Sequence, residues 1–421
     1  MTSERRVVII GQGYVGLPVA MRAIEVGYHV VGIDVADARI ASLRSGVSYV
    51  EDISDEVLGA AIDSGRYTPT IAYADAAGFD FAVITVPTPL RDSLPDLSYI
   101  ESACESIGAY LQQGATVVLE STTYPGTTEE LVVPILERAS GLKAGLDFFV
   151  GYSPERIDPG NKVWGFVETP KVVSGINSES LAKVRGFYDS LVNTTVPVST
   201  PKEAELTKLL ENTFRHVNIA LVNELAVFAH QLGVNVWEAI DAASTKPFGF
   251  MKFTPGPGVG GHCLPVDPSY LSWQVRRTLG QSFRFVELAN DVNDHMPDYV
   301  VQRAMEMLND LSKPLRGASV LLAGVAYKRN SGDSREAPAL RIAELLSDFG
   351  AIVSAADPLV PEVNWPSSLH RVDLSIDTVR AADLVILVTD HDCFDLETLT
   401  QGQVPVLDTR NRITGSEVHQ L

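Results

Sequence analysis

The stretch Arg6-Val-Val-Ile-Ile-Gly11-Gln-Gly-Tyr-Val-Gly16 decides how the N-terminal part of the chain folds. Its β-branched run predicts a buried strand, its glycines predict a tight turn, and the mixed apolar segment 17–26 that follows predicts a helix. Segment 28–35 (YHVVGIDV) predicts the next strand. A strand, a glycine turn, a helix and a second strand in this order predict the first unit of a parallel α/β sheet.

The three glycines of this turn have the spacing of a dinucleotide-binding fingerprint. Gly11 permits the tight turn, Gly13 lets the backbone approach a pyrophosphate, and Gly16 lets the helix pack close to the strand. Asp34 ends the second strand about 20 residues on, where a carboxylate accepts hydrogen bonds from a ribose diol and repels a 2′-phosphate. The alternative is a tight turn with no ligand, but strand, helix and acidic residue together favour NAD, and favour it over NADP. Further cofactor contacts are predicted in the same turn at Tyr14 and Val15.

Three more segments predict buried strands of the same sheet: 79–86, 116–120 and 148–151. Strands that alternate with helical stretches predict a doubly wound parallel sheet, which binds ligands in the loops after its strands. The hydroxyls of Ser121 and Thr122 can hydrogen-bond a cofactor or a reacting water there, although such residues are more often helix caps. The cofactor contacts predicted in these loops are Thr85, Pro87, Thr88, Ser121 and Thr122.

Between about 200 and 310 the pattern becomes helical. Segment 203–232 has apolar residues at helical spacing without Gly or Pro, and it predicts one long helix. Further helices are predicted around 236–243, 270–279 and 285–294, with a loop at 247–268. Strands are predicted again at 318–325, 351–357, 383–389 and 404–408, with a helix at 337–349. The sequence therefore predicts an α/β fold with two Rossmann-like doubly wound parallel-sheet domains, 1–199 and 311–421, joined by a helical central domain, 200–310.

The composition narrows the class of protein and its partners. The 421 residues are 45% hydrophobic and 20% charged, which is typical of a globular protein. A formal net charge of −20 argues against nucleic acid or an anionic membrane as a partner, and it makes any Lys or Arg inside a motif informative. No apolar run has the roughly 18–20 residues of a membrane span, and the first apolar run is too short for a signal peptide. We therefore expect a cytoplasmic protein.

Two polar groupings are candidates for a site. The turn Ser153-Pro-Glu155-Arg156-Ile-Asp158 gathers two acids and a cation at the ligand-facing end of a strand, which favours a site over a solvated loop. In the long helix, Lys208 and Asn212 are four residues apart and share a face. That face can direct an ammonium and an amide at one developing oxyanion. For an isolated lysine, a surface arrangement is the usual alternative.

The three cysteines, Cys104, Cys263 and Cys393, lie too far apart for a metal-ligand cluster, and no metal is predicted. A buried structural thiol accounts for Cys104 and Cys393. Cys263 instead ends the loop Thr254-Pro-Gly-Pro-Gly-Val-Gly-Gly-His-Cys263, whose glycines permit unusual backbone conformations and let a ligand come close. With Asp267 four residues on, Cys263 is predicted to be a covalent nucleophile beside a water-activating carboxylate.

A last candidate segment follows the first strand of the C-terminal half, Gly324-Val-Ala-Tyr-Lys328 and onward to Arg335. Lys328 and Arg335 are cations at the place where a Rossmann-like sheet binds phosphates. The loop departs from the glycine fingerprint, which argues against a second dinucleotide. A different diphosphate ligand fits better.

Together these motifs resemble those of the UDP-glucose/GDP-mannose dehydrogenase family. GQGYVG, PTP, STTYPGT, SPER, the LLEN helix, GPGVGGHC, PVDP and YK…GDSRE occur in family order over nearly the whole chain. The resemblance implies an N-terminal NAD domain, a helical middle that forms the core of a homodimer, and a C-terminal domain that binds the nucleotide diphosphate of a UDP-sugar. It also implies oxidation of the sugar C6 alcohol to a carboxylate, with two hydride transfers to two NAD molecules.

The resemblance further implies a role for each matching residue. Cys263 would attack the intermediate aldehyde to give a thiohemiacetal, and a second oxidation would give a thioester that water hydrolyses. Lys208 and Asn212 would stabilise oxyanions, and Asp267 would place or activate water. Glu155 and Thr122 would assist proton transfer and water positioning. The implied substrate contacts are Glu155, Arg156, Lys208, Asn212, Phe250, Gly258, Gly260, Lys328 and Arg410, with Lys328 also grouped with the cofactor and Arg335 nearby.

The stretches PERIDPGNK, TKPFGF and LPVDPSYLSW are most similar to the bacterial branch that acts on UDP-N-acetylglucosamine, which is the expected substrate. UDP-glucose, UDP-N-acetylmannosamine and GDP-mannose remain alternatives. A non-catalytic sensor of NAD or nucleotide sugar would lack the nucleophile, the lysine or the aspartate, and all are present. A zinc alcohol dehydrogenase would need ligand clusters that the sequence lacks. His262 is left out of the catalytic set because consecutive residues in an extended loop point apart.

Overall fold

The computed structural model describes residues 5–50, 52–91, 94–157, 163–261 and 263–421, with only the backbone of 263–265. The chain forms two compact units, Met1–Glu211 and Asn212–Leu421. Each unit contains a six-stranded sheet whose neighbouring strands are all parallel. The predicted α/β class with two doubly wound sheets is confirmed, whereas the three domain boundaries stay a prediction.

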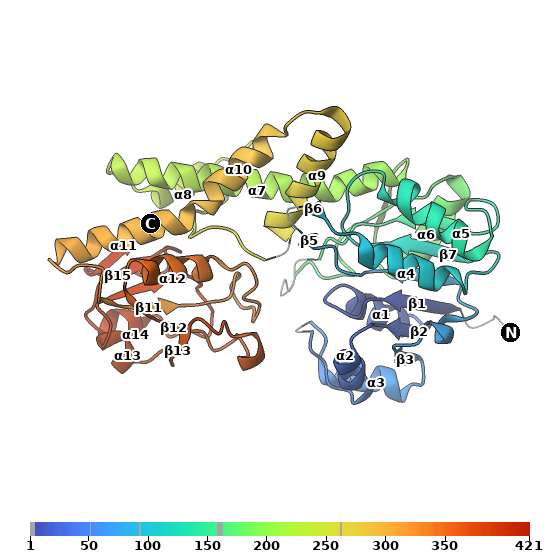
Figure 1. Cartoon of the computed structure of the whole chain (residues 1–421), viewed down its shortest axis with the longest axis horizontal. Coiled ribbons are helices and arrows are strands. Elements are labelled where there is room, and N and C mark those ends of the chain that lie inside the picture. The colour runs from blue at the N-terminus through green and yellow to red at the C-terminus, as the bar shows by residue number, and fades with distance from the viewer. Residues whose placement is uncertain (1–4, 51, 92–93, 158–162, 262) are drawn as a thin grey trace. The chain divides into compact units, whose positions relative to one another are not determined.

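The sheet of the first unit has the strand order β3-β2-β1-β4-β7-β8 (Figure 1). Its strands are β1 (Arg6–Ile10), β2 (His29–Ile33), β3 (Tyr67–Thr70), β4 (Phe81–Ile84), β7 (Thr116–Leu119) and β8 (Phe149–Tyr152). The chain builds outward from β1 to β3 and then crosses to β4 on the other side of β1. In open parallel sheets, such a reversal of direction opens a crevice at the carboxyl ends of the strands, where ligands bind.

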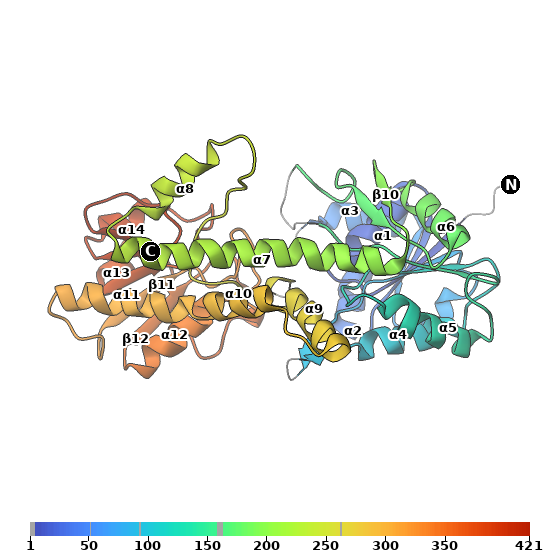
Figure 2. The same ribbon diagram turned by 90° about the horizontal axis from the view of Figure 1, so that it is seen from above.

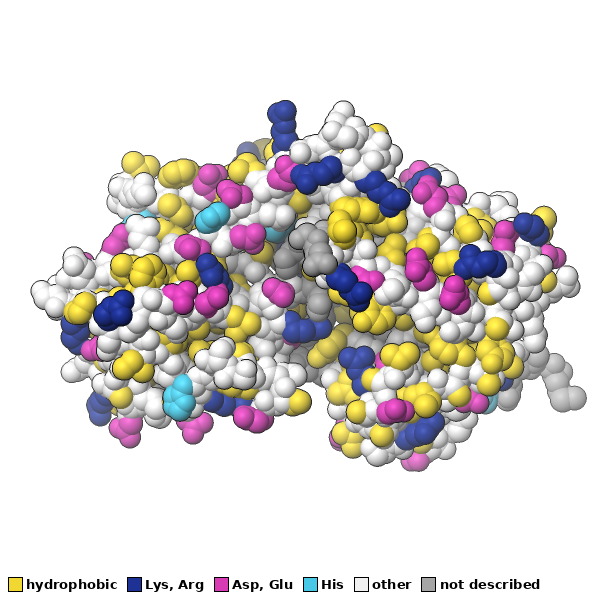
Figure 3. All heavy atoms as spheres, viewed as in Figure 1, with side chains coloured by type: hydrophobic (Ala, Val, Ile, Leu, Met, Phe, Trp, Pro, Cys, Tyr) yellow, Lys and Arg dark blue, Asp and Glu magenta, His cyan; other side chains and the backbone are white. Residues whose placement is uncertain are grey.

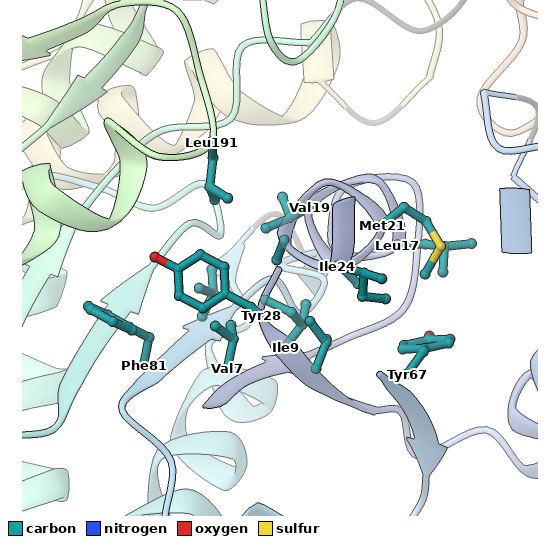
Figure 4. Packing of buried hydrophobic residues seen from close by; sticks show 14 of the residues in the cluster. Val7, Ile9, Leu17, Val19, Met21, Ile24, Tyr28, Tyr67, Phe81 and Leu191 are labelled. Atoms are coloured by element: carbon teal, nitrogen blue, oxygen red, sulfur yellow. The ribbon is translucent and has the colours of Figure 1, made fainter. Parts of the chain in front are cut away.

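Helices cover both faces of this sheet, as β1 shows residue by residue. Val7 and Ile9 pack with α1, α3 and α6, while Val8 and Ile10 pack with α4 and α5, because successive side chains of a strand point to opposite faces. Figure 4 shows the first group, in which apolar side chains of α1 lie over β1. The helices are α1 (Gly16–Glu25), α2 (Asp37–Arg44), α3 (Asp55–Asp63), α4 (Ser98–Gly108), α5 (Val133–Ser140) and α6 (Ser178–Tyr188), with the short η1 (Tyr73–Ala76) and η2 (Thr128–Val132).

Two small strand pairs lie outside the main sheet of the first unit. β9 (Lys171–Val173) and β10 (Thr195–Pro197) pair in parallel, and β5 (Leu90–Arg91) and β6 (Leu94–Pro95) pair antiparallel. β9 matters for the site, because it begins with a fully buried lysine.

The long helix predicted at 203–232 is α7 (Pro201–Gln231), and Figure 2 shows it as one unbroken helix. Its length follows from the absence of Gly and of any Pro after the first position, since Pro at the start of a helix is tolerated. One face of α7 is buried and carries polar side chains, among them Glu205 and His216. The opposite face carries exposed leucines and phenylalanines.

The second unit repeats the architecture of the first. Its sheet has the order β13-β12-β11-β14-β15-β16, in which the crossover again falls beside the first strand. The strands are β11 (Ser319–Ala323), β12 (Ile352–Ala356), β13 (His370–Arg371), β14 (Leu384–Leu387), β15 (Val406–Asp408) and β16 (Val418–Gln420). The helices are α8 (Val236–Ser244), α9 (Cys263–Leu279), α10 (Arg284–Asp294), α11 (Met296–Asp310), α12 (Pro338–Asp348), α13 (Ile376–Arg380) and α14 (Glu397–Gln401), with the short η3 (Glu362–Asn364).

The predicted loop 247–268 is wrong at its end, because α9 already begins at Cys263. The loop was predicted from its content of glycine, proline and aromatic residues, and proline disfavours the helix interior because it removes a backbone donor. Pro265 lies in the first turn, where its missing N–H is not needed, and α9 accommodates Pro268 inside the helix. Cys263 and Asp267 are therefore one helical turn apart.

Two other expectations concern thiols and charge. Cys104 lies in the apolar core of the first unit, and burial raises its pKa to about 12. Cys393 is exposed, so the prediction of a buried thiol is wrong for Cys393.

On the face shown in Figure 3, acidic and basic side chains are interspersed rather than gathered by sign. Among the described residues, no helix has the length and apolar character that crossing a bilayer requires.

Candidate active site

In the glycine turn after β1, two glycines are required by close contacts within the fold, and the third borders open space. Gly11 has φ +94°, and a Cβ there would lie 2.7 Å from the carbonyl oxygen of Thr85. A Cβ on Gly16 would lie 1.8 Å from the carbonyl oxygen of Gly11, so the start of α1 cannot carry a side chain. A Cβ on Gly13 would meet no atom within 4 Å. Gly13 therefore borders open space, where a pyrophosphate can approach the backbone.

Asp34 faces this turn from the end of β2 with a buried carboxylate. Its Oδ2 accepts a hydrogen bond from the backbone N–H of Gln12 at 2.9 Å, and its Oδ1 accepts one from Ala36 at 2.9 Å. The half-exposed guanidinium of Arg39 lies 3.4 Å from Oδ2. A fixed carboxylate beside a glycine turn and a helix N-terminus fits the ribose and the pyrophosphate of NAD.

Gln12 supports the turn from beneath, and the sequence did not single it out. It is fully buried, its Nε2 donates to the Ile9 carbonyl at 2.9 Å, and its Oε1 accepts from the Tyr67 hydroxyl at 2.6 Å. Tyr49 donates its hydroxyl to the Gln12 carbonyl, and burial raises the pKa of Tyr49 to about 12, which keeps the proton on the oxygen. The sequence signal was Gly32 inside a strand, because a Cβ there would lie 2.6 Å from the Gln12 side chain.

Two of the hydroxyls predicted to contact the cofactor form hydrogen bonds within the fold. Thr85 Oγ1 lies 2.9 Å from the carbonyl oxygens of both Ile10 and Gly11, and Ser121 Oγ donates to the Val86 carbonyl at 2.7 Å. These bonds fix the strand ends around the glycine turn. The remaining predicted contacts have at least partly accessible side chains, and their contacts with NAD stay predictions: Tyr14, Val15, Pro87, Thr88 and Thr122.

The loop after β8 places Glu155 and Arg156. Glu155 is buried, and one carboxylate oxygen accepts a hydrogen bond from the backbone N–H of Ile157. Arg156 pairs with Glu211 of α7, with Nη2 and Oε1 2.7 Å apart, and donates from Nη1 to the Pro170 carbonyl. The end of the predicted turn, from Asp158 to Asn161, lies outside the described residues, as does His262.

Lys208 and Asn212 lie on one face of α7 and are buried, with only 8% and 9% of their surfaces exposed. The surface alternative for this pair is therefore wrong. One turn earlier, Glu205 is fully buried and accepts hydrogen bonds from Gly126 N at 2.6 Å, Thr128 N at 2.8 Å and Thr128 Oγ1 at 2.7 Å. Burial raises the pKa of Glu205 to about 7, against the lowering effect of these bonds. Glu205 thus ties the loop after β7 to the helix that carries Lys208.

In the second unit the structure brings two predicted residues into contact. The Asn212 side chain donates from Nδ2 to Asp267 Oδ2 at 2.5 Å, and both residues are buried. Asp267 lies one turn into α9, which begins at Cys263. The free N–H groups at the start of a helix favour negative charge. The backbone of the predicted nucleophile is therefore at the positive end of the same helix that holds Asp267.

Two glycines of the loop before α9 are required by contact with a neighbouring loop. A Cβ on Gly260 would lie 2.5 Å from the Glu336 carbonyl oxygen, and a Cβ on Gly261 would lie 2.7 Å from the Tyr327 ring. Gly261 also donates its N–H to the Arg335 carbonyl at 3.1 Å. The loop that precedes Cys263 is thus packed on segment 327–336, which carries Lys328 and Arg335.

A buried polar network fixes the other end of the same loop. Asn223 of α7 accepts a hydrogen bond from Gly256 N at 2.9 Å and donates to Asn293 Oδ1 of α10 at 2.9 Å. Asn293 also contacts His216, and burial lowers the pKa of His216, so this ring is neutral. A Cβ on Gly256 would lie 2.8 Å from Nη1 of Arg410. None of the three network residues Asn223, Asn293 and His216 was predicted.

Asp357 in the second sheet corresponds to Asp34 in the first but is fully engaged. It follows β12 and accepts hydrogen bonds from Val325 N at 2.8 Å, Ala326 N at 2.9 Å and His391 Nε2 at 2.9 Å, as well as from two backbone groups downstream. Burial raises the pKa of Asp357, but these bonds outweigh it and lower the pKa. Such a carboxylate has no lone pair left for a ribose diol. That this sheet takes a different diphosphate ligand in place of a second dinucleotide stays a prediction.

The cations of the second unit lie around the same strand ends. Arg335 is more than half exposed and pairs with Asp333, with Nη2 and Oδ2 2.5 Å apart. Arg410 follows β15 and donates from Nε to the Val388 carbonyl at 2.7 Å, and burial lowers its pKa. Lys328 is half-buried and Phe250 is exposed. The roles of these residues toward substrate stay predictions.

The fold and the glycine turn define an α/β protein with a dinucleotide-binding sheet and a second sheet of the same topology whose corresponding carboxylate, Asp357, is engaged within the protein. Comparison with known proteins agrees. The UDP-glucose/GDP-mannose dehydrogenase family matches over three successive regions, its NAD binding domain at residues 5–192, its central domain at 202–295 and its UDP binding domain at 321–415. The chain therefore belongs to this family, and it is an NAD-dependent oxidoreductase that acts on a UDP-sugar.

Individual relatives are similar over almost their full length. The chain is 36% identical to a UDP-N-acetyl-D-mannosamine dehydrogenase of Pyrococcus horikoshii over 92% of this chain and 90% of that protein. It is 37% identical to a UDP-N-acetyl-D-glucosamine 6-dehydrogenase of Pseudomonas aeruginosa, over 93% and 92%. The solved structure of the UDP-D-ManNAc dehydrogenase from Pyrococcus horikoshii superposes with a TM-score of 0.89, covering 99% of this chain and 98% of that one at 34% identity.

The glycine turn allows a matched test of the NAD site. Gly16→Ala places a Cβ against the Gly11 carbonyl, and we expect it to destabilise the protein by about 2–3 kcal/mol or more and to lower its melting temperature by roughly 5–10 °C. Gly13→Ala places its Cβ in open space, so the melting temperature should be unchanged, while NAD affinity falls at least about tenfold. Thermal unfolding and NAD titration by calorimetry measure both effects. Normal NAD affinity in the Gly13→Ala protein would contradict the site.

Proposed function

We propose that the protein oxidises the C6 alcohol of UDP-N-acetylglucosamine to the uronic acid in two successive two-electron steps. NAD supplies the hydride acceptor for both. The observation that carries the proposal is the buried hydrogen bond between Asn212 and Asp267, which lies one helical turn from Cys263. A thiol, a carboxylate and an amide in this order suit covalent catalysis on a carbonyl carbon followed by hydrolysis.

In the proposed sequence, the first oxidation turns the C6 alcohol into an aldehyde, with one proton leaving the hydroxyl. The Cys263 thiolate then forms a bond to C6, which gives a thiohemiacetal. Loss of a second hydride from C6 gives a thioester, and water cleaves the S–C6 bond to release the carboxylate and the thiol. The expected products are therefore one carboxylate and two reduced cofactors per sugar.

The surrounding residues have separate proposed roles. Lys208 and Asn212 donate hydrogen bonds to the oxygen on C6 as it gains negative charge. Asp267, held by Asn212, places the hydrolytic water. Glu155 accepts a proton as an ionised carboxylate, and Thr122 helps to position water. Lys328, with Arg335 and Arg410, binds the nucleotide diphosphate and its sugar, for which Arg forks and Lys ammonium groups suit anionic oxygens.

The substrate proposal has two levels. The relatives named above act on sugars that carry an acetamido group at C2, which supports a UDP-2-acetamido-2-deoxyhexose. They divide between the two epimers at C2, with 36% and 37% identity. The sequence stretches that follow β8 and flank Cys263 support the gluco epimer. UDP-N-acetylmannosamine is the competing substrate, ahead of UDP-glucose and GDP-mannose.

A homodimer is proposed from the exposed face of α7. Six large apolar side chains lie along it at intervals of three, four and seven residues, which places them on one stripe: Leu206, Leu210, Phe214, Leu221, Leu225 and Phe228. A continuous apolar stripe on a helix marks an interface rather than a solvated surface. We propose that a second copy of the chain covers it, and that the protein acts in the cytoplasm.

A substrate panel with product counting tests the reaction. Purified protein is incubated with NAD and each of the four nucleotide sugars, and NADH is measured against sugar consumed. We expect two NADH per sugar and the highest kcat/KM for UDP-N-acetylglucosamine. One NADH per sugar would contradict the four-electron scheme, and a higher kcat/KM for UDP-N-acetylmannosamine would reverse the epimer. NAD binding without any NADH formation would favour a sensor.

Cys263→Ser tests the nucleophile. Serine is a far weaker nucleophile at neutral pH, so net turnover should fall by at least about a thousandfold. NAD affinity should stay the same, because the glycine turn belongs to the first unit. Cys393→Ser is the matched control, since this thiol is exposed in the same unit and should be replaceable without loss. Unchanged turnover in the Cys263→Ser protein would refute the assignment.

The stripe on α7 is tested by charge. Leu221→Glu with Leu225→Glu would bury two carboxylates in the proposed interface, so sedimentation equilibrium should show a monomer in place of a dimer. Leu146→Glu is the control, because Leu146 is 80% exposed and not part of α7, so the change should leave the dimer intact. A wild-type protein that is monomeric at micromolar concentration would exclude the dimer.

A further inference from the structure

A buried ion cluster lies beside Glu155 in the first unit, and two of its members have no part in the chemistry proposed above. The ammonium of Lys171, at the start of β9, is 2.5 Å from Oε1 of Glu120 and 3.6 Å from Oε2 of Glu155. The three side chains are only 4%, 0% and 11% exposed. Taking three charges out of water is unfavourable, and an apolar set of the same size would pack at least as well.

Lys171 joins the ends of two strands. It donates a hydrogen bond to the Pro154 carbonyl at 3.2 Å, in the loop after β8 that carries Glu155. Its partner Glu120 directly follows β7 and precedes the loop that contains Thr122. The Tyr188 hydroxyl donates to the same Glu120 oxygen at 2.7 Å and fixes the carboxylate from α6. One ammonium therefore links the two loops that carry the proposed proton-transfer groups.

The three charges are not equally satisfied. Oε2 of Glu155 is buried without a hydrogen-bond partner among the described residues, and so is Oε2 of Glu120. Burial raises the pKa of Glu120 despite the neighbouring ammonium. Burial by itself lowers the pKa of Lys171, but Glu120 and Glu155 outweigh it and raise the pKa. Lys171 therefore stays charged.

Other ionisable groups around this loop do not replace Lys171. On α7, Glu211 forms a salt bridge with Arg156, so these two charges largely cancel. On α6, burial raises the pKa of Tyr188 well above its usual value, so its hydroxyl is neutral. Among the described residues, the ammonium of Lys171 is the cation that forms an ion pair with Oε2 of Glu155, at 3.6 Å.

We propose that Lys171 is a positioning residue that holds Glu155 ionised and in a fixed place, and that Glu120 in turn orients Lys171. The inference rests on the proposed function, in which Glu155 accepts a proton. A carboxylate can do so only in its ionised form, which burial disfavours and a nearby cation favours. Lys171 itself contacts neither substrate nor cofactor in this proposal.

Four variants separate the charge from the packing. Lys171→Met removes the cation, Lys171→Arg keeps it, Glu120→Gln removes the competing carboxylate, and the double variant E120Q/K171M removes both charges. Lys183→Met is the matched control, because Lys183 is an exposed lysine of α6 that lies over the Phe149 ring. Circular dichroism establishes whether each variant folds. If K171M does not fold, E120Q and K171R, which both keep the cation, remain for the comparison with the wild type.

The first measurement is the acid limb of kcat/KM against pH. Lys171→Met should move its midpoint to higher pH by at least about one pH unit, as expected when an opposite charge within about 4–6 Å is lost. The double variant should fall between Lys171→Met and the wild type, and E120Q at or below the wild type. K171R and K183M should follow the wild type. A merely structural pair predicts no such order, and midpoints that coincide in all folded variants would overturn the proposal.

The second measurement needs no turnover. A carboxyl-carbon NMR titration of glutamate-labelled protein, with the Glu155 signal identified by its loss in Glu155→Gln, follows the same midpoint without substrate. The same order of variants is expected. If the NMR midpoints move in this order while no UDP-sugar is oxidised, the proposed function fails and the role of Lys171 stands. If the sugar is oxidised but the NMR midpoints coincide, the role of Lys171 fails alone.

Discussion

Both sheets depend on a chain reversal, directly after their first strand, that only glycine makes without strain. Gly11 and Gly324 have φ +94° and +92°, and each donates its N–H to the last carbonyl of the neighbouring strand, at 2.7 and 2.8 Å. A Cβ at either position would lie within 2.7 Å of the carbonyl oxygen of Thr85 or Thr389. The strands β2 and β4 end in register with β1, and β12 and β14 end in register with β11. In each sheet, the loops that follow these neighbouring strands therefore begin beside the glycine turn.

The two turns are alike in backbone but differ in what they leave free. Asp34 accepts two backbone hydrogen bonds beside the open space at Gly13, so its carboxylate can still receive a ribose diol. Asp357 accepts from four backbone groups and from the buried ring of His391, which completes its capacity as an acceptor. Of these two carboxylates, Asp34 is the one with acceptor capacity left for a ribose diol. His391 and two additional backbone N–H groups account for the difference at Asp357.

Strands with buried faces on both sides could be predicted from the sequence, and polar contacts between distant segments could not. β1, β4 and β7 are short apolar runs, and α7 has helical spacing without a breaker. The sequence does not predict β3, because Pro69 and the threonines of this strand do not form an apolar run. It predicts the start of α9 several residues too late, because Pro268 lies inside this helix. Cys263 and Asp267 could be proposed as site residues from the sequence because their spacing is local, and their roles stay predictions. Other contacts join residues with no fixed spacing in sequence, so no local pattern predicts them. The separations are 51 residues for Glu120–Lys171, 55 for Gln12–Tyr67 and 70 for Asn223–Asn293.

The glycines of the loop before Cys263 are required by contacts within the protein, whatever their contacts with a ligand. Its glycines admit close contact with protein atoms, since Gly260 and Gly261 lie against Tyr327 and Glu336, and Gly256 lies against Arg410. The start of α9 is therefore fixed by the segment that carries Lys328 and Arg335. Within this unit, the loop that would bind the nucleotide diphosphate and the backbone of the proposed nucleophile form one packed structure. Binding energy from the nonreacting end of a substrate raises the rate only when it acts on the reacting groups. In the proposed reaction, the contact of Gly261 with Tyr327 would connect the diphosphate-binding loop to the start of α9.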